Sequence, residues 1–255
     1  MKILKTALRS TAAIALFFLL WDSLARFGAV DRFILPTVTD VLRAFGQNIL
    51  NGKLPGHIAV SLQRTGTGFL LAVAIGIPLG IFMGWFRKLE QFLDPILQLF
   101  RNTSVLAMFP VFILAFGLGE KSKIAIVFWG SIWPALLNTI SGVKGLDPIL
   151  VKSARSMGIS TFGLFRKVVL PGALPEILTG IRLSAGVATI ILVAAEMIGA
   201  NKGLGFLIFY AQQKYDVPTM YVGILTISFI GILINYMLIR IERRAVAWKS
   251  YRNST

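Results

Sequence analysis

The sequence predicts an all-α, polytopic membrane protein with six transmembrane helices. Of its 255 residues, 56% are hydrophobic and only 15% are charged, whereas soluble domains carry about 25% charged residues. Four runs without charge are each about as long as the roughly 20 residues that a spanning helix needs. They cover residues 65–86, 102–119, 124–143 and 217–239.

A fifth span is predicted at 177–199, which is apolar except for Arg182 near its start and Glu196 near its end. A charge in either position can reach the membrane interface or the interior of the protein.

The sixth predicted span, 10–27, contains the apolar core AAIALFFLLW and follows three cations. A signal peptide has the same pattern and is the alternative reading. The stretch lacks a small-x-small cleavage site, and a sixth span balances the charges better, so a transmembrane helix is favoured.

The distribution of lysine and arginine predicts the orientation. With a cytoplasmic N-terminus, 15 of these residues fall inside and 9 outside, as the positive-inside rule requires. The net charge of +15 is then assigned to the cytoplasmic rim rather than to nucleic acid. Both termini are expected in the cytoplasm, in a bacterial inner membrane. The predicted segments are a cytoplasmic N-terminus (1–9), the first span (10–27), an extracytoplasmic loop (28–64), a core of five spans with a cytoplasmic loop at about 144–171 (65–240), and a cytoplasmic basic tail (241–255).

Catalytic chemistry is scarce in this composition. The chain has no cysteine and a single histidine, His57, and its eleven acids are dispersed, so no catalytic residues, metal ligands or cofactor are predicted. A proton-coupled secondary transporter remains the alternative function, although it would want several intramembrane acids and an internal repeat. Beyond Glu196, neither several intramembrane acids nor an internal repeat is seen.

The cytoplasmic loop VKSARSMGISTFGLFRKVVLP (151–171) predicts two short amphipathic helices. Asp147 is a good N-cap and Gly158 can end the first helix, 148–157, in a left-handed conformation. A second helix begins at Ser160 or Thr161, packs through two phenylalanines, and is stopped by Pro171.

The first of these helices has two expected faces. Leu150, Ala154 and Met157 share one, and Lys152, Arg155 and Ser156 share the other. Such a pair of helices could lie on the lipid interface or could dock onto a partner protein, and the residues alone leave both readings open.

The loop resembles the EAA loop of binding-protein-dependent ABC importer permeases, through Ala154, Gly158, Val168, Leu170 and Pro171. Two departures are Lys152 in the place of the usual acid and Ser153 in the place of the first alanine. Other stretches look like the permeases for nitrate, sulfonate, taurine and bicarbonate, among them SLQRTGTGFLLAVAIGIPLGIFMGW (61–85), LPGALPEILTGIRLSAG (170–186) and VAAEMIGANKGLGFLI (193–208).

The resemblance implies a type I ABC importer permease fold and a role as the transmembrane subunit of an ATP-driven importer. Implied partners are a second permease subunit, most often an identical one, two ATPase subunits and an extracytoplasmic solute-binding protein. The stretch GLGEKS (117–122) is no ATP site, since Glu120 stands where a phosphate-binding loop requires glycine. Sulfonate or taurine is the expected solute, with nitrate, bicarbonate and a thiamin-precursor pyrimidine left open. Residues expected to couple to the ATPase are Lys152, Ser153, Ala154, Arg155, Gly158, Leu170 and Pro171.

Several polar residues within the spans are candidates for the translocation path or its gate. Arg101 could meet an anionic solute, although a partner such as Asp94 or snorkelling to the interface would also explain it. Glu196 is read either as a gate or helix-locking residue, or as an interfacial group. The candidate path residues are Arg101, Asn102, Ser104, Trp133, Asn138 and Glu196. A ladder of small residues, Gly76, Gly80 and Gly84, predicts close packing against another helix.

Overall fold

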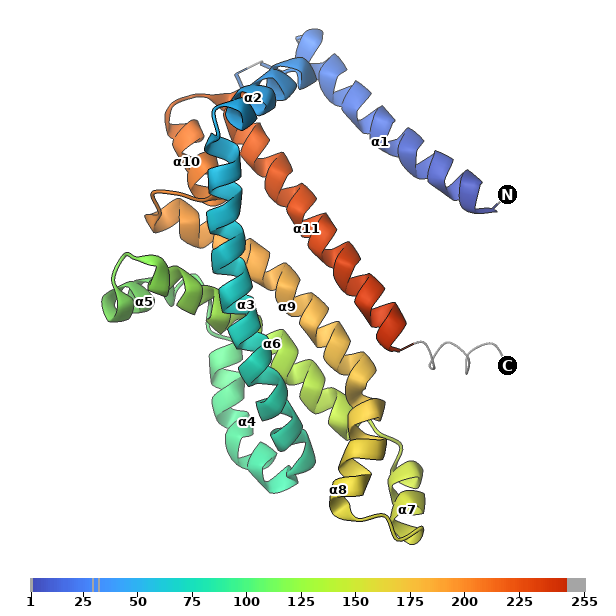
Figure 1. The fold of residues 1–255 in the computed structure, drawn as a ribbon. Helices are drawn as coiled ribbons and strands as arrows, with labels where there is room; N and C mark the ends of the chain where they lie inside the picture. The colour runs from blue at the N-terminus through green and yellow to red at the C-terminus, as the bar shows by residue number, and fades with distance from the viewer. Residues whose placement is uncertain (1, 29, 32, 247–255) are drawn as a thin grey trace. The chain divides into compact units, whose positions relative to one another are not determined.

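The structure, a computed structural model, describes residues 2–28, 30–31 and 33–246, and within these ranges it contains helices and turns but no β-strand. This confirms the predicted all-α class. The helices are α1 (Lys2–Arg26), α2 (Val38–Leu50), α3 (Lys53–Trp85), α4 (Arg87–Arg101), α5 (Phe109–Phe116), α6 (Glu120–Lys144), α7 (Pro148–Ser156), α8 (Thr161–Leu164), the π-helix η1 (Phe165–Val169), α9 (Leu170–Gly199), α10 (Leu204–Gln213) and α11 (Val217–Ala245) (Figure 1).

Four helical stretches of the described chain are long and apolar enough to cross a membrane. They are α3, α6, α11 and the continuous run Thr161–Gly199, which contain four of the six predicted spans. The chain is therefore a multi-pass membrane protein. Helix α1 covers the first predicted span, while most of the predicted basic tail, from 247 onward, lies outside the described residues.

The chain forms two compact units, and α3 and α11 run through both. The first unit comprises residues up to 60 together with 201–228. Within it the indole Nε1 of Trp21 donates to the carbonyl oxygen of Pro36 at 2.8 Å, and the backbone N–H of Gly203 donates to Nδ1 of His57 at 3.0 Å. The predicted loop 28–64 is largely helical, because it holds α2 and the first turns of α3.

Helix α6 is the centre of the second unit, which holds the candidate functional residues. Helix α3 runs parallel to it, and the glycine ladder lies in the contact. A Cβ at Gly76 would lie 3.1 Å from Ile132, and one at Gly80 would lie 2.7 Å from the Cβ of Thr139. At Gly84 the nearest atom would be Val143 Cβ, also 2.7 Å away. The two backbones can approach this closely because the ladder carries no side chains.

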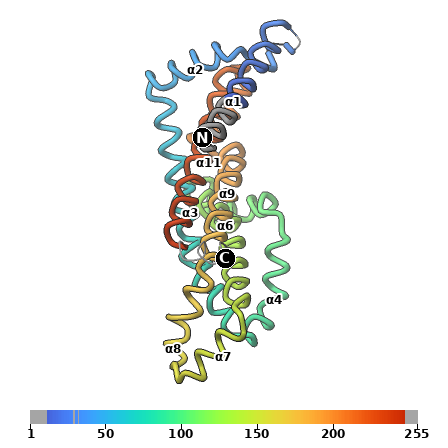
Figure 2. The backbone as a smooth tube through the Cα atoms, turned by 90° about the vertical axis from the view of Figure 1, so that its right-hand side faces the viewer, coloured from blue at the N-terminus to red at the C-terminus, as the bar shows by residue number. Residues whose placement is uncertain are grey.

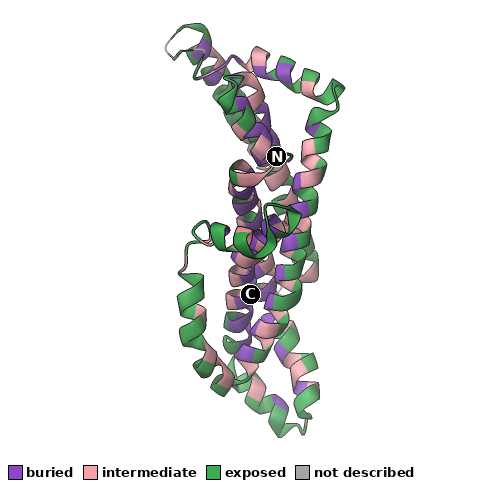
Figure 3. Ribbon diagram, turned by 90° about the vertical axis from the view of Figure 1, so that its left-hand side faces the viewer, coloured by how far each residue is buried: buried purple, intermediate pink, exposed green. Residues whose placement is uncertain are grey.

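Helix α9 packs against α6 in the opposite direction. A Cβ at Gly180 would lie 2.9 Å from Pro134 O, and the hydroxyl of Ser184 donates to the carbonyl oxygen of Ser131 at 2.7 Å. In Figure 3, α6 and α9 carry much of the buried surface of this unit, whereas α4 has no buried residue.

The predicted span at 102–119 is wrong as a single helix. The chain instead turns back along α6 as two helices, α4 and α5, with residues 102–108 between them. The ion pair between Lys144 Nζ and Glu90 Oε1, at 2.7 Å, places the start of α4 beside the end of α6. A search for uncharged runs missed α4 because its exposed side carries charges.

Candidate functional site

The predicted coupling loop forms a helix where the sequence placed it. The carboxylate of Asp147 accepts the backbone N–H of Ile149 at 2.8 Å, and Pro148 occupies the first turn of α7. The helix ends before Gly158, whose φ of +74° lies in the left-handed region that favours glycine. The local cap and turn chemistry thus defines both ends of α7.

The faces of α7 differ in part from the expectation. Ala154 is buried and, with Val151, packs against the cluster formed by Leu164, Val169 and neighbouring residues. Leu150 and Met157 do not join it, since they are 51% and 80% exposed. The predicted apolar face is therefore not buried as a whole, because the helix packs on the following helix through Val151 and Ala154. Lys152, Ser153 and Arg155 are exposed.

The exposed surface of the loop combines cations with large apolar side chains. Ile149 and Phe162 are 69% and 73% exposed, so Phe162 does not pack as predicted, whereas Phe165 packs edge-on against Trp85 at 5.8 Å between ring centroids. Figures 1 and 2 both draw α7 and α8 projecting beyond the end of α6. We call this surface the loop face; it consists of Ile149, Leu150, Lys152, Arg155, Met157 and Phe162.

The second helix does not stop at Pro171. After α8, capped by Ser160 Oγ at 3.2 Å from the N–H of Gly163, the chain passes through the π turn η1 and continues as α9. Leu170 and Pro171 therefore belong to the first turn of a helix that runs unbroken from 161 to 199. The wider π turn lies immediately before Pro171, which has no N–H to donate. The loop is joined directly to a spanning helix.

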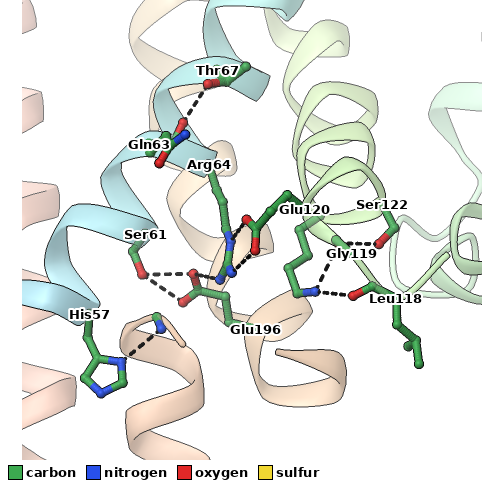
Figure 4. Close-up of polar contacts among 12 residues, drawn as sticks. His57, Ser61, Gln63, Arg64, Thr67, Leu118, Gly119, Glu120, Ser122 and Glu196 are labelled. Carbon is green, nitrogen blue, oxygen red and sulfur yellow. Dashed lines mark hydrogen bonds and ion pairs between the residues drawn. The ribbon is translucent and has the colours of Figure 1, made fainter. Parts of the chain in front are cut away.

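Glu196 lies in a buried charge cluster near the C-terminal end of α9 (Figure 4). Its side chain is fully buried and its Oε1 accepts from Arg64 Nη1 at 2.8 Å. The hydroxyl of Ser61 lies 2.9 and 2.8 Å from the two carboxylate oxygens. Glu196 is therefore not an interfacial group, and this structure places it among helices α3, α6 and α9.

Two further charges from the start of α6 complete the cluster. Glu120 receives Nε and Nη2 of Arg64, each at 2.5 Å. The ammonium of Lys123, whose side chain is almost fully buried, donates to the carbonyl oxygens of Leu118 and Gly119 at 2.8 and 3.2 Å. Arg64, Lys123 and Glu196 are buried and each has hydrogen-bond partners, as buried charges require, whereas the Glu120 side chain is 59% exposed. The cluster joins three helices and the turn before α6.

The remaining candidate path residues are not brought together at one place. Arg101, Asn102 and Ser104 are exposed at the C-terminal end of α4 and in the following turn. Trp133 packs beneath the apolar face of α4, and Asn138 donates its amide to Pro134 O at 2.8 Å beside the contact with α9. Asp94 accepts a hydrogen bond from Gln98 at 2.8 Å.

Comparison with known proteins now identifies the family. Residues 76–246 match the model of the family described as binding-protein-dependent transport system inner membrane component. The chain belongs to this family. It is 36% identical over 236 residues to SsuC of Bacillus subtilis (strain 168), which is named an aliphatic sulfonates transport permease protein; the match covers 92% of this chain and 86% of that protein. It is 35% identical over 244 residues to the taurine transport system permease protein TauC of Escherichia coli (strain K12), covering 94% and 89%.

A solved structure supports the same fold. The permease matches a chain in a structure titled as inward-facing conformations of the MetNI methionine ABC transporter, with a TM-score of 0.67 and 20% identity. The match covers 76% of the permease and 96% of that chain. The permease is thus a multi-pass inner-membrane component that depends on ATPase and solute-binding partners, and it is not itself an enzyme.

Sequence reasoning missed four members of the charge cluster in the permease: Ser61, Arg64, Glu120 and Lys123. Arg64 was placed in an outer loop because it precedes the uncharged run at 65–86, yet only 1% of it is exposed. One signal was available. Ser61 and Arg64 are three residues apart and therefore lie on one face of a helix. Extending the predicted span 65–86 by one turn toward the N-terminus would have placed both residues on the same face of that span.

Proposed function

We propose that this permease is one subunit of an ATP-driven importer for a small anionic solute, an organic sulfonate such as taurine. The names of SsuC and TauC support this solute class, since both refer to sulfonates. Six spans with both termini in the cytoplasm, and pairing with an identical subunit, complete the proposal.

The loop face carries this proposal. It presents cations and large apolar side chains on a short helix that is capped at both ends and joined directly to a spanning helix. A rigid projection of this kind can enter a groove on an ATPase subunit. When the ATPase subunits close on nucleotide, the movement would then be transmitted to α9. A helix pair lying on lipid would not need the fixed turn at Gly158.

Reconstitution in proteoliposomes tests the function. The permease, the ATPase and the binding protein encoded beside it should together hydrolyse ATP faster when taurine-loaded binding protein is present, and should accumulate taurine only with ATP. A proton-coupled secondary transporter would instead accumulate solute on a pH gradient without any ATPase. That result would replace the proposal.

The permease without its ATPase should bind no nucleotide. Glu120 in the stretch resembling a phosphate-binding loop is engaged with Arg64, and a side chain replaces the glycine that such a loop needs. Equilibrium binding of a fluorescent ATP analogue to the purified permease checks this. Stoichiometric binding would contradict it.

A further inference from the structure

Helix α4 has a polar face that the packing of the described chain leaves uncovered. Its polar residues recur at steps of four and three, which places them on one side of a helix. All are exposed in the structure: Arg87, Gln91, Asp94, Gln98 and Arg101. We call these residues the α4 polar face.

Beyond Lys88 and Glu90 in the first turn, the other two sides of α4 are apolar and differ in their surroundings. Leu89, Leu93 and Leu97 pack against the cluster around Met83. On the third side Phe92 and Leu99 are 75% and 65% exposed. An apolar exposed side is suited to lipid, whereas a polar exposed side is not.

The contacts of α4 with α6 fix how deep this polar face reaches. Its start lies beside Lys144, the last residue of α6, through the pair with Glu90. Near its end the ring of Phe100 lies 5.2 Å from that of Trp129. Trp129 is nine residues into α6, about 14 Å along the axis of a helix that crosses the bilayer. Arg101 therefore lies near mid-membrane depth.

The chain is irregular at that depth. Residues 102–108 separate α4 from α5, and Val105 in this segment approaches Gly130, the neighbour of Trp129. Non-helical backbone at membrane depth is tolerated only where protein buries it or where it lines a water-filled cavity. Broken helices of this kind form solute sites at the midplane of other transporters. Asn102 and Ser104 are exposed here, which favours water.

We propose that the α4 polar face lines a water-filled half-pathway that runs from the cytoplasmic side to mid-membrane, where Arg101, Asn102 and Ser104 meet a small oxyanion. The charges explain the ligand class. Asp94 lies a helical turn or more below and is bonded to Gln98, so the deep end presents a cation with neutral donors. Sulfonate oxygens accept hydrogen bonds from both. This inference rests on the proposed transport function and adds the route and the contact residues.

Paired cysteine substitutions test the route, because the chain has no cysteine of its own. Gln91→Cys and Gln98→Cys should react with a membrane-impermeant thiol reagent applied from the cytoplasmic side of inverted vesicles. Phe92→Cys and Leu99→Cys are their neighbours at nearly the same depth, are also exposed, and should react at least tenfold more slowly in lipid. If all four cysteines react equally slowly, nucleotide-free or vanadate-trapped, the face is covered by a second copy or by lipid and the proposal fails.

Transport by Arg101 variants tests the anion contact. Arg101→Gln should raise the KM for taurine about tenfold, the effect of losing one charged hydrogen bond, and Arg101→Lys should raise it less. An unchanged KM in Arg101→Gln at normal expression overturns the contact. The thiol labelling measures accessibility and not ATP hydrolysis, so it can fail while stimulated hydrolysis persists, and the reverse. Failure of this inference is thereby separated from failure of the proposed function.

Discussion

At the scale of residues, the most constrained group in the permease is the pair formed by Arg64 and Glu196. Both side chains are almost completely removed from solvent, and the hydroxyl of Ser61 satisfies the carboxylate further. Such a pair adds little net stability compared with an apolar substitute, but removing Glu196 takes from the buried Arg64 its fully buried carboxylate partner and leaves the exposed Glu120. We propose that the pair fixes how α3, α6 and α9 meet, which is the helix-locking alternative for Glu196.

Single and double substitutions should separate the net stability that the pair adds from the cost of removing one of its members. Glu196→Leu should destabilise the permease by about 3 kcal/mol, because Arg64 would lose its buried carboxylate partner and keep the largely exposed Glu120. Adding Arg64→Met should recover much of that loss. The midpoint of thermal unfolding of the purified permease in detergent measures both effects.

The exposed pair between Lys144 and Glu90 is the matched control. Lys144→Ala should cost no more than about 1 kcal/mol, as exposed pairs do. If Glu196→Leu alone is as mild as Lys144→Ala, or if the double variant is no better than the single one, the cluster does not lock the helices.

At the scale of elements, the permease depends on how closely α3 approaches α6. The ladder of Gly76, Gly80 and Gly84 could be read from the sequence, since small residues at every fourth position are typical of close helix contacts. The identity of the partner helix, α6, could not be read from the sequence. Periodicity shows which side of α3 carries small residues, but it does not show which helix packs there. Likewise the coupling helix was predictable from Asp147 and Gly158, whose capping chemistry is local. The directions of Leu150 and Met157 were not, because they follow from tertiary packing on α8 and α9.

Alanine at two glycines of α3 tests the close approach. Gly80→Ala places a Cβ 2.8 Å from the carbonyl oxygen of Leu136 and 2.7 Å from Thr139 Cβ, so it should cost about 1–3 kcal/mol, as overpacking does. Gly66→Ala meets nothing within 4 Å and should be neutral or slightly stabilising, since alanine favours helix. Thermal unfolding of the two variants, compared side by side, measures the difference. Equal midpoints would show that α3 and α6 do not pack so tightly.

At the scale of the whole molecule, the question is how a transport subunit without an ATP site of its own receives energy. The chain is an inner-membrane component of a transport system, and its stretch most like a phosphate-binding loop has Glu120 in place of the required glycine. We therefore propose that energy enters through a contact with another subunit. The sequence identified the membrane class and predicted the ends of α7, the helix that we propose makes this contact. It misjudged the third crossing, because the charges of the α4 polar face conceal a helix from any search for uncharged runs.

The topology is open to a direct check. Cysteines at Ser10, Lys53, Lys202 and Ser250 should label from outside the intact cell only at 53 and 202, because the charge distribution predicts that both termini are cytoplasmic. Position 250 lies outside the described residues. External labelling at position 10 would reverse the orientation of the first span and refute the six-span topology.

The central claim is that α7 transmits the action of a separate ATPase, and the turn at Gly158 tests it most directly. Gly158→Val strains a backbone at φ +74° by on the order of 1–2 kcal/mol, whereas Gly158→Asn is tolerated there, since asparagine adopts this conformation readily. ATP-driven taurine uptake should be measured for both variants in proteoliposomes containing equal amounts of inserted permease. The account predicts near-normal uptake with Gly158→Asn and loss of uptake and of stimulated hydrolysis with Gly158→Val. Normal coupled uptake with Gly158→Val would contradict it.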